Sequence, residues 1–412
     1  MTPAEIRAVS SLGGHAFAGL VSRIEQAHLA TGKRVFTALG PVSGIARPVH
    51  DSITGAAYFA VRTVGQKAGS MGGQVVSLLG VDAPPPSHEQ GGGLALAALN
   101  AFTGDRLGPD LAPLAIRMAV RADGHDVDPL TAEAVAAKFP RATAKIAVFV
   151  HGLAETENSW RWRSRASAPY GPRLAAEFGY TPVYIRYNTG RHVSVNGHSL
   201  AGLLESLTTA WPEPVAEILL VGHSMGGLVI RSACHYGRRD GSAWADQVRH
   251  VFYLGSPHLG APLARAAGYA GWVLGRAPGT RPFASMVTWS DGIKDLRHGY
   301  VLDDDWAGCD QDRCVRDHRR EAPLLAGANH YVISATVSAG PGGPLGAAVG
   351  DLLVQTASAH GRRGAARHIP FRADLSRQLG GMHHLDLLNH RDVWAAMRDL
   401  LREHRREATG PQ

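Results

Sequence analysis

From about residue 141 onward, short apolar runs alternate with segments of helical periodicity, and this alternation constrains the fold more than any other feature of the chain. Each apolar run has the length of a strand that is buried on both faces. The runs expected to be strands are 146–150, 182–187, 218–221, 251–254 and 331–334. Strands that alternate with helices form a parallel sheet covered by helices. We therefore predict an α/β fold with a mostly parallel sheet flanked by helices and closed by an amphipathic helix over 393–401.

The chain of 412 residues is long enough for two domains. Apolar residues recur at helical spacing over much of residues 1–80 and again over 94–140, so we expect residues 1–140 to form a helical N-terminal region. Residues 141–412 are expected to form the α/β domain. The N-terminal helices either pack on that domain as a small bundle or offer an amphipathic platform to a lipid surface.

The strand expected at 218–221 runs into the hexapeptide Gly-His-Ser-Met-Gly-Gly at residues 222–227, and a helical segment follows. A serine in a sharp turn between strand and helix is held in a strained conformation that exposes its hydroxyl above the sheet. Gly222 and Gly226 let the strand and the helix approach closely. The helix N-terminus behind the turn favours negative charge on an acyl oxygen. We therefore predict that Ser224 is a nucleophile.

The first expected strand ends in His151-Gly152-Leu153, which has the form of a loop that supplies a donor to an oxyanion hole. Two backbone N–H groups must point at the negative oxygen that develops during acyl transfer. We predict that these are the amides of Leu153 and of Met225, the residue after the nucleophile. His151 is expected to be a structural hydrogen-bonding residue.

The partners of a serine nucleophile on this type of sheet follow it in the order acid, then histidine. Asp351 lies in a loop beyond the last expected strand, which makes it the predicted acid. Asp386 is too close in sequence to the expected base to orient it. The base is expected shortly before the final helix, where the two adjacent histidines His383 and His384 both qualify. The remaining competing acids precede the last strand and are Asp291, Asp295, Asp303, Asp304 and Asp305.

Together these motifs resemble the lipase/esterase branch of the α/β-hydrolase superfamily, with a triacylglycerol lipase-like pattern over roughly residues 145–400. In such enzymes the strand after the nucleophile helix commonly ends in a Ser/Thr-Pro-His-x-Gly turn, and residues 256–260 have this form. The catalytic histidine commonly precedes a Leu-Leu pair, here at 387–388, which favours His384 over His383. One departure is Leu352, which stands where the family usually has a glycine after the acid.

The resemblance implies an α/β-hydrolase fold with a cap or lid insertion at about residues 263–328 in the α/β domain, which is then the catalytic domain. It also implies hydrolysis of carboxylic esters, by an esterase or a lipase, through a Ser224–His384–Asp351 triad and an acyl-enzyme. An acyltransferase or an amide hydrolase would use the same site. A third alternative is a non-catalytic protein that binds a lipid or granule surface. The substrate is expected to be a small-molecule or lipid ester.

The insertion contains apolar side chains that either line an acyl pocket or form the core of the cap, namely Trp272, Phe283, Met286, Trp289 and Trp306. The acidic run Asp303–Asp305 is interpreted as a solvated loop, with a calcium site as the alternative. No cofactor or metal is predicted.

The net charge of +7 comes without a Lys/Arg block interleaved with aromatic residues, so we expect no nucleic-acid partner. Neither a signal peptide nor a transmembrane segment is evident, which favours a cytoplasmic location. Cys309 and Cys314 have the spacing of a small disulfide loop, which would instead suit an exported protein. The sequence does not specify an oligomeric state.

Overall fold

The computed structural model describes residues 90–108, 111–163, 168–261, 289–308, 318–339, 350–362 and 368–408, together with Val21, Glu25, Leu29 and Tyr58. Most of the N-terminal region, Cys309 and Cys314, and the side chains of Trp272, Phe283 and Met286 lie outside the described residues. The division into 1–140 and 141–412, and the role of 263–328 as a cap, therefore stay predictions. The described part of that insertion contains the helices α12 (Asp291–His298) and α13 (Asp303–Trp306).

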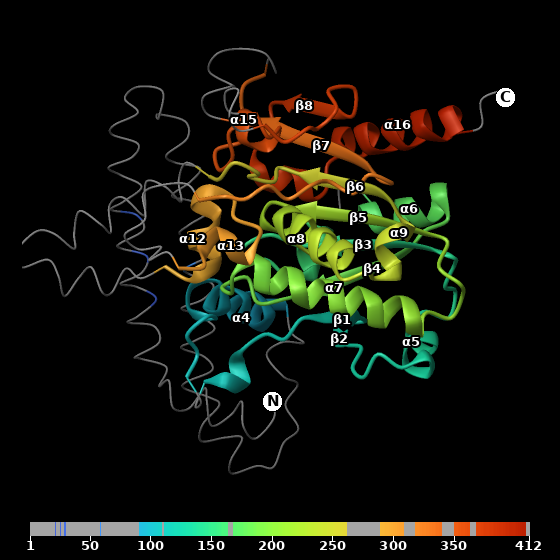
Figure 1. Ribbon diagram of the computed structural model, residues 1–412, viewed down its shortest axis with the longest axis horizontal. Coiled ribbons are helices and arrows are strands. Elements are labelled where there is room, and N and C mark those ends of the chain that lie inside the picture. Colours follow the sequence, from blue (N-terminus) through green and yellow to red (C-terminus); the bar gives the residue numbers. More distant parts are fainter. Residues whose placement is uncertain are drawn as a thin grey trace, which may run out of the picture.

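One sheet of eight strands forms the centre of the described structure (Figure 1). Its spatial order is β2-β1-β4-β3-β5-β6-β7-β8, and every pair from β4 to β8 is parallel. Strand β1, which lies between the edge strand β2 and β4, runs antiparallel to both of them. The strands are β1 (Ala119–Ala122), β2 (His125–Asp126), β3 (Lys145–Val150), β4 (Thr181–Arg186), β5 (Glu217–His223), β6 (Val248–Leu254), β7 (Asn329–Thr336) and β8 (Ser376–Gly380).

Helices cover both faces of this sheet, because the central strands alternate apolar side chains between two cores. Ile146 and Val148 of β3 face one core with the helices α7 and α8, which lie in front of the sheet in Figure 1. Ala147 and Phe149 face the other core with α6 and α16. The other helices of the described residues are α4 (Gln90–Thr103), α5 (Ala132–Lys138), α6 (Tyr170–Phe178), α7 (Val193–Ala210), α8 (Met225–Arg239), α9 (Ala243–Gln247), α15 (Thr356–Ala359) and α16 (Arg391–Ala408), with 3₁₀ turns η2 (Ala112–Leu114), η3 (Glu157–Arg161) and η5 (His384–Leu388).

The expected mostly parallel sheet flanked by helices is confirmed, but its lower edge begins earlier than predicted. Residues 94–140 are not helical throughout, since β1 and β2 lie between α4 and α5. These strands are short, and β1 is anchored by pairing with β4, a tertiary contact that local periodicity does not report. The sequence analysis also missed β8, whose residues Ser-Arg-Gln-Leu-Gly are only partly buried and lack an apolar run.

The strand order brings two loops together at the carboxyl edge of the sheet. Since β4 and β5 lie on opposite sides of β3, the direction in which strands are added reverses at β3. In open α/β sheets, ligands bind at the carboxyl ends of strands where this reversal occurs. Val150 at the end of β3 lies opposite Gly222 near the end of β5. The loops that follow these two strands are therefore neighbours.

Candidate active site

Ser224 lies in the turn between β5 and α8, which we call the serine turn (residues 222–227). Its backbone has φ 52° and ψ −122°, a conformation that residues other than glycine rarely adopt. The turn is held on both sides, because the Ser224 amide donates to the carbonyl of Leu254 at 2.9 Å and its own carbonyl accepts from Gly227 at 3.1 Å. The sheet and the helix thus hold a strained, half-buried serine at the carboxyl edge.

Two glycines make the close approach around the serine turn possible. A Cβ atom on Gly226 would lie 2.2 Å from the carbonyl oxygen of Val150. A Cβ atom on Gly222 would lie 2.6 Å from the Cα of Gly227. Both contacts are with backbone atoms, which cannot move aside as a flexible side chain can. Helix α8 is therefore packed as tightly on β3 and β5 as two glycines allow.

We expect Gly226→Ala to lower the free energy of unfolding by roughly 1–3 kcal/mol or more, because the new methyl group overlaps backbone atoms. The matched control is Gly202→Ala on α7, where a Cβ atom would meet nothing within 4 Å. That change should raise the stability by about 0.5–1 kcal/mol, because alanine is the better helix former. Urea denaturation measures both variants. Wild-type stability in Gly226→Ala would contradict the packing described here.

The β3 loop (residues 151–155) lies directly against the serine turn. A Cβ atom on Gly152 would lie 3.0 Å from the Cβ of Ser224, so the two segments touch. The amides of Leu153 and Met225 donate to no acceptor in the described part of the chain. Leu153 is half-buried and Met225 is buried. Two unpartnered backbone donors beside Ser224 are what a negatively charged oxygen requires.

The side chain of His151 packs against the backbone of the β3 loop. The side chain is completely buried, and its Nδ1 lies 2.9 Å from the carbonyl oxygen of Gly152. Tyr187 donates its hydroxyl to the His151 carbonyl at 2.8 Å and stacks on the imidazole with ring centroids 4.5 Å apart. Burial lowers the pKa of His151. These contacts agree with the structural role expected for this histidine.

The structure brings Asp351 and His384 together, although 33 residues separate them in the sequence. His384 Nδ1 donates to Asp351 Oδ2 at 2.7 Å, and both side chains are buried. A Cβ atom on Gly255 would lie 3.0 Å from His384 Cε1, so this glycine lets the imidazole approach the end of β6. His384 Nε2 is buried and has no partner among the described residues. The carboxylate therefore fixes the ring with its second nitrogen available for a proton.

The loop around Asp351 is built to hold the carboxylate in one orientation. Asp351 Oδ1 accepts hydrogen bonds from the amides of Leu353 at 3.1 Å and Val354 at 2.8 Å, which leaves Oδ2 for the histidine. Leu352 has a φ of 82°, in the left-handed region that favours glycine. This is the position where the resembling enzymes usually have glycine, so the chain keeps the turn and places a strained leucine in it.

The electrostatic surroundings of His384 favour its charged form. Burial by itself lowers the pKa of the imidazole. The charge of Asp351 and the hydrogen bond to it act in the opposite direction, and the charge of Glu155 adds to them, so the pKa of His384 is raised. A histidine that takes a proton during a reaction is stabilised by such neighbours.

His384 also lies beside the serine turn, through the residue that precedes Ser224. The His223 imidazole lies 4.7 Å from the His384 imidazole between ring centroids, and His223 Nε2 is 3.2 Å from the His384 carbonyl oxygen. No hydrogen bond joins the Ser224 hydroxyl to His384 Nε2 in this structure. Such contacts often tighten only when substrate binds.

The alternative base, His383, has a different partner. Its Nε2 lies 3.3 Å from Asp386 Oδ2, and the same aspartate forms an ion pair with Arg163 at 2.7 Å. Asp386 therefore pairs with His383, the residue that caps η5, and not with the His384 imidazole. Of the two adjacent histidines, His384 is the one hydrogen-bonded to Asp351.

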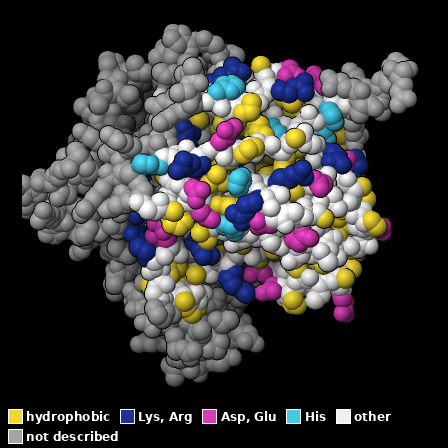
Figure 2. All heavy atoms as spheres, in the orientation of Figure 1, with side chains coloured by type: hydrophobic (Ala, Val, Ile, Leu, Met, Phe, Trp, Pro, Cys, Tyr) yellow, Lys and Arg dark blue, Asp and Glu magenta, His cyan; other side chains and the backbone are white. Residues whose placement is uncertain are grey.

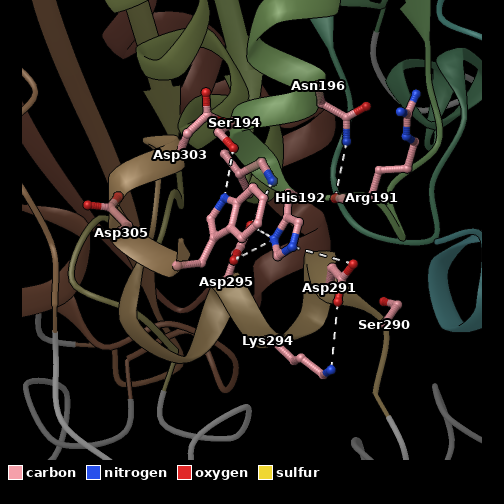
Figure 3. A network of polar contacts seen from close by, with 12 residues as sticks. Arg191, His192, Ser194, Asn196, Ser290, Asp291, Lys294, Asp295, Asp303 and Asp305 are labelled. Carbon is pink, nitrogen blue, oxygen red and sulfur yellow. Dashed lines mark hydrogen bonds and ion pairs between the residues drawn. The ribbon is translucent and has the colours of Figure 1, made fainter. Parts of the chain in front are cut away.

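The competing acid Asp295 belongs to a second buried histidine–carboxylate pair, shown in Figure 3. Both of its carboxylate oxygens lie 3.1 Å from His192 Nδ1, and Oδ2 also accepts from the Val193 amide at 2.8 Å. Burial lowers the pKa of His192, but the hydrogen bond and charge of Asp295 outweigh it, so that pKa is raised. The Trp306 ring stacks on His192 at 3.8 Å. Asp295 thus joins α12 to the N-terminus of α7.

The acidic run at 303–305 is not the solvated loop predicted from the sequence. It forms the short helix α13, and Asp305 is buried because it accepts hydrogen bonds from the Val301 and Leu302 amides, each at 2.8 Å. Asp303 is paired with His198 at 2.8 Å. Within the described residues, no group of three or more His, Cys, Asp or Glu side chains has an arrangement that could hold a metal ion.

Two further side chains that the sequence analysis did not assign lie against these loops. Glu155 ends the β3 loop and contacts His223, with 2.9 Å between Oε1 and Nδ1. Burial raises the pKa of Glu155, but the charge of His223 and three further interactions outweigh it, so the pKa of this carboxyl is lowered. The only signal in the sequence was that each residue adjoins a predicted motif.

On the face shown in Figure 2, Lys and Arg side chains are interspersed with Asp and Glu rather than gathered in a basic stripe. None of the helices among the described residues is both long and apolar enough to cross a membrane.

Residues 143–270 match the sequence family described as "PGAP1-like alpha/beta domain". The protein has an α/β-hydrolase fold. This agrees with the resemblance found from the sequence motifs, and the matched segment runs from β3 through the serine turn and β6. No curated protein sequence matches the chain.

The solved structures that are similar to this chain include three enzymes with low sequence identity. Lipase BlEst2 from Bacillus licheniformis is 20% identical, with a TM-score of 0.41 over 62% of this chain and 91% of that chain. The thioesterase RedJ from the prodiginine pathway of Streptomyces coelicolor is 20% identical, with a TM-score of 0.35 over 63% and 88% of the two chains. Phospholipase PlaB from Legionella pneumophila is 15% identical, with a TM-score of 0.34 over 63% and 62%.

Proposed function

We propose that this α/β-hydrolase cleaves carboxylic esters, as an esterase or lipase, through an acyl-enzyme formed on Ser224. The observation that carries the proposal is the buried hydrogen bond between His384 and Asp351, 2.7 Å long, next to a strained serine turn. The Asp351 carboxylate holds His384 through Nδ1, and His384 Nε2 is buried without a partner among the described residues. An oriented imidazole with one nitrogen available is the form that a general base requires.

In the proposed reaction, His384 Nε2 takes the proton of the Ser224 hydroxyl as the oxygen attacks the ester carbonyl carbon. The carbonyl oxygen becomes negative and accepts hydrogen bonds from the amides of Leu153 and Met225. The tetrahedral intermediate expels the alcohol, which receives the proton from His384 and leaves an ester on Ser224. Water then attacks that ester with the same proton transfers and releases the acid. Asp351 holds the imidazole and stabilises its charge in both halves.

We expect the choice of ester to depend on two segments of the chain. The insertion at 263–328 is the segment we expect to border the acyl group, and the N-terminal region is the segment we expect to meet any lipid surface. Of the apolar side chains expected to line a pocket, Trp306 of α13 donates to Ser194 of α7 at 3.0 Å and stacks on His192. Its contacts therefore favour a role in anchoring the insertion.

The proposal is tested by labelling the nucleophile. A fluorophosphonate should phosphonylate the native protein with one equivalent per chain, and mass spectrometry should locate the adduct on the peptide that contains Ser224. Hydrolysis of a p-nitrophenyl ester should be lost in step with labelling. Label on another residue, or ester hydrolysis that continues after complete labelling, would show that Ser224 is not the nucleophile.

A further inference from the structure

Glu155 fastens the β3 loop to itself and to the serine turn. Its Oε2 accepts the Gly152 amide hydrogen bond at 2.7 Å, and its own amide donates to the Gly152 carbonyl at 3.3 Å. These two contacts close the loop around Leu153, whose amide is left without an acceptor in the described residues. The other oxygen, Oε1, lies 2.9 Å from His223 Nδ1. The side chain is only 12% exposed.

His223 continues the chain of contacts to the histidine loop. It occupies the end of β5 next to Ser224, and its side chain is completely buried. Its Nε2 lies 3.2 Å from the carbonyl oxygen of His384. A carbonyl oxygen and a carboxylate are both hydrogen-bond acceptors, so each ring nitrogen of His223 faces one acceptor. Neither Glu155 nor His223 contacts a substrate carbonyl in the proposed reaction.

The contacts from Gly152 through Glu155 and His223 to His384 therefore join the β3 loop, the serine turn and the loop that carries His384. The proposed reaction depends on the relative position of these three segments. Backbone loops on a sheet edge are not fixed relative to one another by the sheet alone. An error of about 1 Å in a donor or base costs a large part of the rate, because the oxyanion interacts only at the right distance. A buried, charged hydrogen-bond network is stiff enough to set such distances.

Resting on the proposed function, we propose that Glu155 is a positioning residue for ester hydrolysis, which through His223 holds the β3 loop and the His384 loop in register with Ser224. It binds no substrate and transfers no proton in this role. Its contribution should appear in the transition state, where the oxyanion meets the Leu153 amide, and not in the binding of the ground-state ester.

The experiment compares Glu155→Ala and Glu155→Gln with the wild-type protein, using a p-nitrophenyl ester and rates normalised to the sites titrated by a fluorophosphonate. Glu155→Ala should lower kcat on the order of 100-fold, as expected when an oxyanion donor loses its position, while KM changes by less than about threefold. Affinity for a trifluoromethyl ketone should fall in parallel with kcat/KM. Glu155→Gln keeps an oxygen that can accept from the Gly152 amide, and its NH₂ group can donate to His223 Nδ1 in the neutral tautomer that carries its proton on Nε2. This variant should recover about tenfold or more of the loss.

The matched control is Glu217→Ala. Glu217 is the first residue of β5, and His223 is the last. Glu217 also is partly buried and contacts a histidine, with 3.4 Å to His250 Nε2, and it forms an ion pair with Lys145. The Glu217→Ala variant should have a lower melting temperature than the wild-type protein and the same kcat per titrated site. A normal kcat per site in Glu155→Ala, a loss confined to KM, or no recovery in Glu155→Gln would overturn the positioning role. If the wild-type protein neither hydrolyses the ester nor labels at Ser224, the proposed function fails first.

Discussion

Replacing Ser224 by alanine is expected to lower kcat for p-nitrophenyl esters by about 10⁴-fold or more, because no covalent intermediate can form. The expectation follows from the strained turn, with φ 52° at Ser224, and from the neighbouring His384, which in this variant has no hydroxyl to deprotonate. A series of acyl chain lengths should lose activity uniformly. The residual rate should come from the two amide donors and from substrate binding alone.

The matched control for this variant is Ser206→Ala. Ser206 lies on α7, and its hydroxyl donates only to the Gly202 carbonyl of its own helix, at 3.0 Å. The same chemical change there should leave the rate unaltered. Circular dichroism should show that both variants are folded. If Ser224→Ala hydrolysed the whole ester series at the wild-type rate, the assigned nucleophile would be wrong.

Changing Asp351 and Asp295, two buried aspartates that each pair with a histidine, should separate catalysis from stability. Asp351→Asn is expected to lower kcat by roughly 10³–10⁴-fold, because an amide facing His384 Nδ1 favours the wrong tautomer and cannot stabilise the imidazolium. The carboxylate distance behind this expectation is 2.7 Å. The protein should remain folded, since the asparagine oxygen can still accept from the Leu353 and Val354 amides.

Asp295→Asn provides the matched comparison, because Asp295 is equally buried and lies 3.1 Å from His192 Nδ1. Its pair joins α12 to α7 (Figure 3), so the variant should lose roughly 1–3 kcal/mol of stability and keep a kcat close to that of wild type. Initial rates and urea denaturation on both variants measure the difference. A large loss of kcat in Asp295→Asn with a normal rate in Asp351→Asn would exchange their roles.

Much of the sheet was predictable because its central strands are buried on both faces. Apolar runs at 146–150 and 251–254 fall within β3 and β6, whose residues are almost all buried. The strands near the two edges of the sheet lack such apolar runs and could not be predicted in this way. Strand β1 was assigned to helix and β8 was missed, because both strands are short and owe their conformation to pairing with a neighbouring strand.

The sequence analysis chose Asp351 as the candidate acid over its competitors by chain order rather than by geometry. Asp305 illustrates the limit, since an acidic run normally indicates a solvated loop. Its carboxylate can be buried because it accepts hydrogen bonds from two backbone amides. No property of residues 303–305 alone indicates those donors. The pairing of Asp295 with His192 was equally invisible, because it spans 103 residues.

By itself, the sequence determined the α/β layering and the candidate positions Ser224, Asp351 and His384, because glycine spacing and apolar runs are local properties of the chain. Only the tertiary structure decided that Asp351 and His384 share a hydrogen bond and that the β3 loop lies against the serine turn. It alone decided that Glu155 and His223 connect these loops. These contacts depend on which strands are neighbours, and that order is set by packing the whole sheet rather than by any one segment.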